Sequence, residues 1–540
     1  MDAVADRTTC RRPWQSRQPD APEKVEATGA SFDIAAAVGQ ARGQPMERPN
    51  ILLLMSDQQR WDTLGCYGCT AIPTPALDGL AAAGVVFERC YVDVPICTPS
   101  RACMLTGKLP AGHGVYGIHD TLPDDQVLFP EHLSRLGYQT ALVGKLHVSG
   151  RAVECLERHP HDGFERYEWS IDPQVHLDSP FNAHAAWLRE HHPGFLDRLL
   201  TGSQDHHPEE AHFNTWAAER AIAFLEERDP ERPFFLNVSL FDPHNPYFDY
   251  PLAAGALVDR SRIPPVQPLT VAHEPVPDGV ARERALFHAG QGRAADPRRR
   301  DIDAIRHGYL ASVAFMDRQI GRIFAELERR GMADNTLVLF VSDHGDMIGD
   351  LDLITKGAYF YDPCTRVPMI LRLPQGELAG HRVHDLVQPH DLAATLLRAA
   401  GMAPPEVAAL MPQSMDLAAL ARDGAGYPER RDHAITLYRN AGIGPGQQFW
   451  DPPIYASMFH DGRYKLTLYQ DPAARRDPEG ELYDMQDDPG ETTNLWSDRR
   501  HAGRRDHLIH RLSAALVASE VQHLAGRAGR SWPYAHGPRR

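Results

Sequence analysis

Short apolar runs of strand length alternate with amphipathic stretches over most of this chain. Four of the runs lead directly into polar residues that can carry chemistry, and they lie at residues 51–55, 140–143, 234–240 and 337–341. Because these runs are continuously apolar, they predict strands of a sheet that is buried on both faces. The pattern therefore predicts an α/β fold, with a large, mostly parallel sheet covered by helices on both faces.

Helical spacing characterises the stretches between these runs. Residues 305–330 predict the longest helix, because apolar side chains recur there every three or four positions and Gly331 can end it. Another helix is predicted from Pro75, which suits a first helical turn, and a third over residues 391–400 before Gly401. We expect the apolar side chains of the longest helix to pack in the core.

The predicted pattern of strands and helices changes after about residue 425. Runs at 454–459 and 463–469 predict antiparallel strands, and residues 506–519 predict a final helix. Two irregular segments, 151–212 and 251–300, are expected to be inserted surface loops. The predicted division is a disordered tail (1–46), a large α/β domain (47–425) and a small α+β domain with an antiparallel sheet (426–540).

Net charge and cysteine content limit the kinds of binding partner and the cellular compartment that this chain suits. The chain has 540 residues and a formal net charge of -16, which disfavours nucleic acid and anionic membranes but not a small anionic substrate. No apolar run approaches the ~20 residues of a membrane span, and the N-terminal stretch lacks the apolar segment of a secretory signal. Eight cysteines do not make a dense disulfide framework, so we expect a reducing cytoplasm.

Two aspartates follow predicted strands in the same way. Asp57 and Asp343 each come after an apolar run and a serine, and the carboxyl ends of parallel strands meet at one edge of a sheet. Two converging carboxylates repel each other unless a cation lies between them, and oxygen ligands favour Ca²⁺, Mg²⁺ or Mn²⁺. Gln58 can add an oxygen and His344 a nitrogen. The alternative for Asp57 alone is a helix cap or a turn.

Four further residues follow or neighbour strand ends. They are Lys145 and His147 after one strand, His244 after another, and Lys356 beyond the Asp343 loop. Each by itself suits a surface or capping position. Together they supply two cations for a tetrahedral oxyanion and two imidazoles for proton transfer. That combination suits cleavage of a sulfuryl or phosphoryl ester.

Cys97 begins a short predicted helix with Pro99 in its first turn. The free N–H groups at a helix N-terminus favour an anion there, and Arg101 can approach the same position. The alternative is a buried core cysteine, which is the usual place of a lone cysteine.

The stretch Cys97-Thr98-Pro99-Ser100-Arg101, continued to Leu105-Thr106-Gly107, resembles the sulfatase signature. Together with the strand-end residues, it makes the chain similar to a sulfatase of the alkaline-phosphatase superfamily over residues 49–495. The closing segments 481–484 and 488–495 are typical of bacterial members. In that family the signature cysteine is oxidised to formylglycine by a formylglycine-generating enzyme. The resemblance therefore implies one divalent cation, with Ca²⁺ preferred over Mn²⁺ or Mg²⁺, and formylglycine at Cys97.

The resemblance also implies roles at the site. The metal and Arg101 would polarise the formylglycine hydrate, one hydroxyl of which attacks sulfur, while Lys145 and Lys356 hold the sulfate oxygens. His244 would protonate the leaving alcohol, and His147 would take the proton that lets sulfate depart. The implied catalytic residues are Cys97, Arg101, Lys145, His147, His244 and Lys356. The implied metal ligands are Asp57, Gln58, Cys97, Asp343 and His344.

Residue 58 departs from the commonest family pattern, because many sulfatases have a second aspartate where this chain has Gln58. Glutamine there resembles choline-sulfatase-like and phosphonate-monoester-hydrolase-like members. Phosphonate hydrolases generally lack the lysine and the histidine that this chain has as Lys145 and His147. The presence of these two residues favours a sulfuric ester hydrolase of the arylsulfatase-like or choline-sulfatase-like kind. The alternatives are a phosphonate monoester or phosphodiester hydrolase and, more remotely, a non-catalytic metal-binding relative. A homo-oligomer is left open.

Overall fold

A nine-stranded mixed sheet organises the part of the chain that the computed structural model describes, which is residues 48–202, 205–289, 301–442, 449–471 and 477–525. Its strand order is β4-β3-β5-β1-β6-β8-β2-β7, and β9 pairs with β2. The strands are β1 (Asn50–Ser56), β2 (Val85–Tyr91), β3 (Gln139–Gly144), β4 (Arg166–Trp169), β5 (Phe234–Ser239), β6 (Thr336–Ser342), β7 (Arg366–Val367), β8 (Met369–Arg372) and β9 (His381–Val387).

The four strands that the apolar runs predict lie side by side in this sheet. β3 pairs with β5, β5 with β1, and β1 with β6, and all three pairings are parallel. Their carboxyl ends consequently share one edge, as the fold prediction requires. Antiparallel pairings occur where β8 joins β6 and β2, so the sheet is mostly parallel and the predicted fold class is confirmed.

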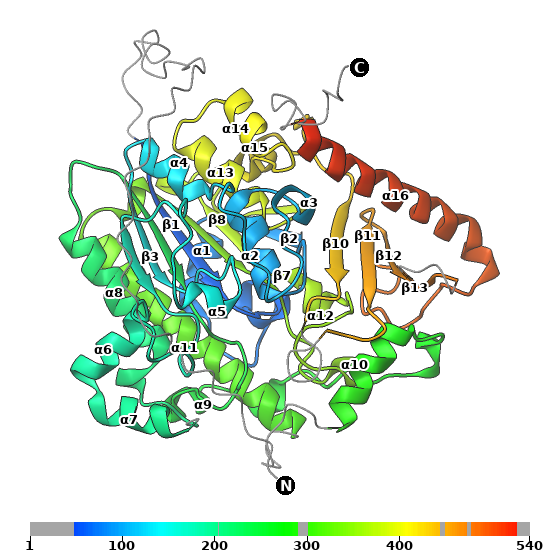
Figure 1. The fold of residues 1–540 in the computed structure, drawn as a ribbon, viewed down its shortest axis with the longest axis horizontal. Coiled ribbons are helices and arrows are strands. Elements are labelled where there is room, and N and C mark those ends of the chain that lie inside the picture. The colour runs from blue at the N-terminus through cyan, green and yellow to red at the C-terminus, as the bar shows by residue number, and fades with distance from the viewer. Residues whose placement is uncertain (1–47, 203–204, 290–300, 443–448, 472–476, 526–540) are drawn as a thin grey trace, which may run out of the picture. The chain divides into compact units, whose positions relative to one another are not determined.

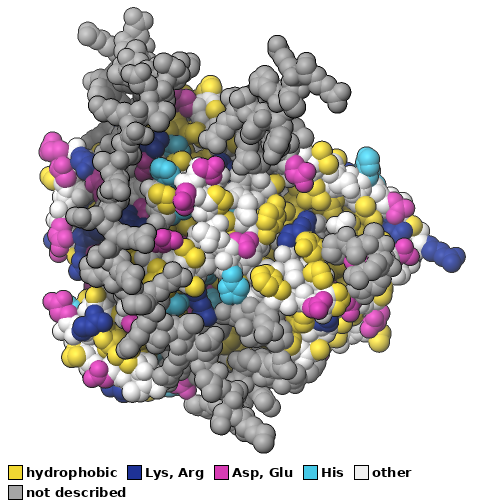
Figure 2. Space-filling view, in the orientation of Figure 1, with side chains coloured by type: hydrophobic (Ala, Val, Ile, Leu, Met, Phe, Trp, Pro, Cys, Tyr) yellow, Lys and Arg dark blue, Asp and Glu magenta, His cyan; other side chains and the backbone are white. Residues whose placement is uncertain are grey.

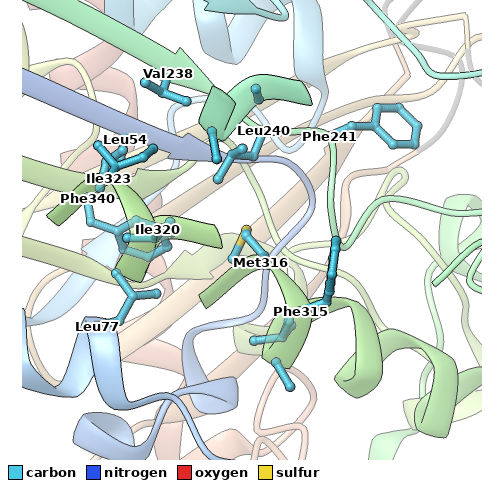
Figure 3. Close-up of a cluster of buried hydrophobic side chains, with 14 of the residues drawn as sticks. Leu54, Leu77, Val238, Leu240, Phe241, Phe315, Met316, Ile320, Ile323 and Phe340 are labelled. Carbon is cyan, nitrogen blue, oxygen red and sulfur yellow. The ribbon is translucent and has the colours of Figure 1, made fainter. Parts of the chain in front are cut away.

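Helices cover both faces of the large sheet, with α8 and α11 along one face and α2, α4 and α13 along the other (Figure 1). On one face, Leu54, Val238 and Phe340 of the strands meet Met316 and Ile320 of α11 (Figure 3). The helices in chain order are α1 (Pro75–Ala82), α2 (Cys97–Thr106), α3 (Pro110–His113), α4 (Phe129–Arg135), α5 (Arg151–Glu154), α6 (Ala183–His191), α7 (Pro193–Thr201), α8 (Phe213–Glu227), α9 (Leu252–Gly255), α10 (Asp278–Ala289), α11 (Ile302–Arg329), α12 (Asp362–Thr365), α13 (Asp391–Ala399), α14 (Pro404–Leu410), α15 (Leu417–Asp423) and α16 (Ala502–Ala525).

A second, antiparallel sheet of four strands follows in the order β10-β11-β12-β13. Leu466 and Leu482 of this sheet pack against Leu508 and Leu512 of α16. An antiparallel sheet and a final helix are therefore confirmed for this region, while the boundary near residue 425 stays a prediction. The strands are β10 (Ala434–Arg439), β11 (Tyr455–His460), β12 (Tyr464–Gln470) and β13 (Glu479–Asp484).

The expectation of loops at 151–212 and 251–300 is wrong for much of both segments. The first contains α5, β4, α6 and α7, and the second contains α9 and α10. Prolines misled the interpretation, because Pro193 occupies the first turn of α7 instead of breaking a helix. The Asn182 side chain caps α6 by accepting from the Ala185 N–H. The predicted tail at 1–46 lies outside the described residues.

The surface mixes charges of both signs. Figure 2 shows acidic and basic side chains interspersed with apolar ones on the face in view. Among the described helices, none is both long enough and apolar enough to cross a bilayer.

Candidate active site

The common edge of the four parallel strands brings two carboxylates and an arginine together. Asp57 follows β1 and Asp343 follows β6, and both are fully buried. Arg101, one turn into α2, donates from Nε to Asp343 Oδ2 at 2.7 Å and from Nη2 to Asp57 Oδ2 at 3.3 Å. Its Nη1 donates to the Lys145 carbonyl at 3.0 Å and to Ser239 Oγ at 2.8 Å. One guanidinium therefore contacts residues at all four strand ends.

Positive groups control the ionisation of Asp57. Burial by itself would raise the pKa of this carboxyl, but Lys145, His244 and Arg101 hold the pKa below its ordinary value. The closest of these groups is Lys145, whose Nζ lies 2.5 Å from Asp57 Oδ2. Asp57 is therefore a carboxylate at neutral pH, as a metal ligand must be.

Cys97 is the first residue of α2 and is buried beside these carboxylates, so its predicted place at a helix start is confirmed. Its Sγ lies 3.0 Å from His344 Nε2 and 3.9 Å from Asp57 Oδ1. Burial would raise the pKa of the thiol, yet Lys145, Lys356 and His344 bring that pKa well below its ordinary value. The position at residue 97 thus stabilises negative charge, which suits a nucleophile.

Four groups at this edge have the arrangement of a metal site. Ligand atoms of Asp57, Cys97, Asp343 and His344 all lie within 4.8 Å of one another. Two carboxylates and an imidazole are a donor set that accepts Ca²⁺, Mg²⁺ or Mn²⁺. The residues present therefore fit a divalent cation.

Gln58, the fifth predicted ligand, has other partners for its side chain. Its Nε2 donates to Asp346 Oδ2 at 2.6 Å, and its Oε1 accepts a hydrogen bond from Lys356 Nζ. Its backbone N–H donates to Asp343 Oδ1 at 3.0 Å. Gln58 thus joins the Asp343 carboxylate to Lys356, and its role as a metal ligand stays a prediction.

Lys145 and His147 lie in a turn beyond β3, where the backbone is no longer regular. Gly144 has φ 104° and His147 has φ 56°, both in the left-handed region. A regular strand would place residues 145 and 147 on the same face. In the turn that is present instead, both side chains also reach the site. His147 Nε2 lies 3.0 Å from Thr98 Oγ1. Burial and the neighbouring Lys145 lower the pKa of His147 to about 3, so its ring is neutral at neutral pH.

His244 and Lys356 form the outer part of the site. Lys356 Nζ lies 2.8 Å from His244 Nε2, and His244 Nδ1 lies 2.8 Å from the Asn245 carbonyl. The carbonyl fixes the proton on Nδ1, because it can only accept. The structure therefore brings every predicted site residue to one edge of the sheet.

Two protein-family models match this chain. The sequence model of the sulfatase family matches residues 49–402, and the model described as N-sulphoglucosamine sulphohydrolase, C-terminal, matches residues 353–518. The chain belongs to the sulfatase family. Membership in it implies a metal ion and formylglycine, and the donor set described above fits the first of these.

Relatives of this sulfatase act on sulfate esters of different kinds. An arylsulfatase of Clostridium perfringens is 27% identical over 89% of this chain and 96% of its own length. An N-acetylglucosamine-6-O-sulfatase of Bacteroides thetaiotaomicron is 26% identical, covering 89% of this chain and 88% of that protein. Among solved structures, the phosphonate monoester hydrolase of Agrobacterium radiobacter has a TM-score of 0.70 at 25% identity, covering 88% and 96%.

Several contacting residues of the sulfatase site were not predicted from the sequence. Asp346 orients Gln58, Thr98 contacts His147, and Ser239 at the end of β5 receives Arg101. Asp346 follows Asp343-His344-Gly345 directly, so its position in the motif was the available signal. For Thr98 and Ser239, short hydroxyl side chains carry no comparable signal.

Proposed function

We propose that this sulfuric ester hydrolase cleaves a small sulfated alcohol by means of formylglycine formed at Cys97. The observation that carries the proposal is the placement of Cys97 at the start of α2, with its Sγ within 4.8 Å of ligand atoms of Asp57, Asp343 and His344. Formylglycine at residue 97, once hydrated, would supply a nucleophilic hydroxyl for the cleavage of the ester and a second hydroxyl whose proton His147 can accept. A formylglycine-generating enzyme is then the partner needed for maturation.

The basic side chains divide into two functions. Lys145 and Lys356 supply ammonium groups that bind the sulfate oxygens as negative charge develops on them. When its Nε2 carries a proton in addition to the one on Nδ1, His244 gives that proton to the departing alcohol, and the neutral His147 accepts one when sulfate departs. Over the whole reaction, one water is consumed, and alcohol and hydrogen sulfate are released.

Asp57, Asp343 and His344 would hold the divalent cation, for which we propose Ca²⁺ ahead of Mn²⁺ and Mg²⁺. When bound, such an ion lowers the pKa of a coordinated hydroxyl and polarises an oxygen of the ester. Arg101 keeps both aspartates oriented towards the same point by its two contacts with them.

The substrate remains within a small set of sulfate esters. Aryl, choline and sugar sulfates are each represented by relatives, the second by a choline-sulfatase of Rhizobium meliloti that is 26% identical over 84% of this chain. We propose screening kcat/KM across these three kinds. For the compartment we propose the cytoplasm, because the cysteines of the described part are all unpaired.

A phosphonate monoester hydrolase is the second candidate. It is favoured by the similarity to the Agrobacterium radiobacter structure and by Gln58. The test compares kcat/KM on an aryl sulfate and on a phosphonate monoester with the same leaving group, and a higher value for the sulfate supports the first proposal. Cys97→Ala should abolish both activities, while peptide mass across Cys97 should fall on conversion to formylglycine. Unchanged turnover in Cys97→Ala would refute both candidates.

A further inference from the structure

Glu154 is a buried carboxylate for which the reaction described above has no use. It ends the short helix α5, and the residue is 3% exposed. Four N–H groups point at its two oxygens. Oε2 accepts from the His147 N–H at 2.8 Å and from the Trp169 indole at 3.0 Å, and Oε1 accepts from Val148 at 2.7 Å and from Ser149 at 3.1 Å.

Most of the groups that donate to Glu154 belong to the turn that contains His147. Three of the four are consecutive backbone N–H groups, beginning at His147 itself. The backbone of His147 is left-handed, a conformation that costs a non-glycine residue free energy and persists only where the surroundings fix it. A carboxylate that accepts three successive N–H groups supplies that constraint.

The fourth donor anchors the carboxylate to the sheet. Trp169 is the last residue of β4 and is fully buried, and it lies opposite Gly144, the last residue of β3. The chain of contacts runs from β4 through Trp169 and Glu154 to the backbone of His147. The His147 ring, at the end of this chain, lies 3.0 Å from Thr98 of the signature helix.

We infer that Glu154 is a positioning residue that holds His147 in its left-handed turn, so that the ring can accept the proton when sulfate departs. The inference rests on the role proposed for His147. An ionised carboxylate is needed, because it only accepts hydrogen bonds. A glutamine amide would place an NH₂ group against two of the four N–H donors.

The test compares Glu154→Gln with the native protein in two measurements. Hydrogen exchange, read by mass spectrometry on peptides that span residues 145–150, should become faster by about 10-fold or more as the hydrogen bonds to residues 147–149 are lost. This measurement does not depend on turnover, so it remains valid if the proposed function fails. Unchanged exchange in this segment would overturn the inference.

Steady-state kinetics with an aryl sulfate provide the second measurement. Release of the alcohol precedes release of sulfate, so slowing only the later stage lowers kcat and KM together and leaves kcat/KM unchanged. We expect a fall of about 10-fold or more in kcat, at the lower end of what a general base contributes. A fall in kcat at constant KM is the signature of a reduced fraction of folded enzyme and would overturn the inference.

Three further variants complete the test. Glu154→Asp keeps the charge and should restore part of kcat, and adding Glu154→Gln to His147→Ala should lower kcat no further. A further loss in that double variant would overturn the inference. If Glu154→Gln does not fold, Trp169→Phe removes one N–H donor and keeps an aromatic, though smaller, side chain, and it should produce smaller changes in the same directions. Unchanged exchange and kcat in Trp169→Phe would then count against the inference.

The matched control is Asp317→Asn on α11. Asp317 is likewise buried and accepts two backbone N–H groups, from Ala76 at 3.0 Å and Leu77 at 2.8 Å, at the start of α1. Exchange across residues 145–150 and KM should both stay native in this variant, whereas in Glu154→Gln exchange rises and KM falls. Equal changes in the control would show a general response to losing a buried carboxylate and would overturn the inference.

Discussion

Lys465 joins two buried carboxylates from distant parts of the chain, and replacing it with methionine tests how strongly this contact holds the structure together. Its Nζ lies 2.6 Å from Asp362 Oδ1 and 2.7 Å from Glu491 Oε1. The backbone N–H of Asp362 also donates to Glu491 Oε2 at 2.6 Å. Asp362 begins α12, shortly after Lys356. The ammonium on β12 therefore ties the antiparallel sheet to the segment that carries a proposed catalytic lysine.

The expected loss of stability follows from the burial of the three side chains. The side chains of Lys465, Asp362 and Glu491 are 1%, 7% and 2% exposed. Methionine keeps most of the lysine's apolar contacts but leaves two carboxyl groups without their ammonium, and removing one partner of a buried ion pair costs about 3–5 kcal/mol. With an unfolding entropy of about 2.1 cal/mol/K per residue over about 490 residues, roughly 1 kcal/mol corresponds to one degree. Tm should therefore fall by about 3–5 °C.

The assay is thermal unfolding at a fixed scan rate, which keeps the values comparable if unfolding is irreversible. Arg463→Met is the matched control, because Arg463 lies beside β12 and pairs with Asp484 at 2.6 Å, but its side chain is 44% exposed. Its Tm should change less, since exposed pairs contribute little. Burial raises the pKa of Glu491 to about 8, so Asp362 is the carboxylate that loses its counter-charge, and adding Glu491→Gln to Lys465→Met should change Tm little further. A Tm decrease in Lys465→Met no larger than in the control would refute the reasoning.

Three further predictions concern the site and its pH dependence. Arg101→Lys keeps the charge but loses the forked contact with Asp57 and Asp343, so kcat/KM on the best sulfate ester should fall by about 10²-fold or more; near-native kinetics would contradict this. Burial raises the pKa of Glu283 to about 7, so the folded protein retains a proton that the unfolded chain loses above 4.5. Stability should fall as pH rises through that window, and Glu283→Gln should reduce the difference in Tm between about pH 5 and about pH 8. Chelation of divalent ions should abolish turnover and lower Tm, because an ion that binds only the folded state stabilises it. Adding Ca²⁺, Mg²⁺ or Mn²⁺ singly identifies the ion, whereas full activity after exhaustive chelation would rule out the metal.

The fold could be predicted from the sequence where burial is the same on both sides of a strand. β1, β3, β5 and β6 are mostly apolar for that reason, and their parallel direction is typical of strands that are separated by helices. β2 and β8 carry weaker signals, because β2 ends in Glu-Arg-Cys-Tyr and β8 has four residues. Their mixed pairing depends on contacts between distant segments, which no local pattern records. The helix α7 was missed because its proline, Pro193, lies at the helix start.

The site could be predicted as a set of residues but not as a set of contacts. Parallel strand ends must converge, so Asp57, Asp343, Lys145 and His244 were expected to share one edge. The partners of Gln58 depend on loops that follow the strands, including the unpredicted Asp346. Glu154 was missed for a related reason. Glu154 accepts hydrogen bonds from three backbone N–H groups in a left-handed turn. A backbone conformation of that kind cannot be predicted from the side chains in the sequence.

The spacing within Cys97-Thr98-Pro99-Ser100-Arg101 now has a physical explanation. Residues four apart lie on the same face of a helix, so in α2 the first and last residues of the signature point towards the same edge of the sheet. Arg101 contacts residues at the ends of β1, β3, β5 and β6, and this fixes how α2 sits over them. Cys97, one turn earlier, is thereby placed beside Asp57 and His344. The arginine of the signature therefore does more than balance charge, because the position of residue 97 follows from the contacts that Arg101 makes.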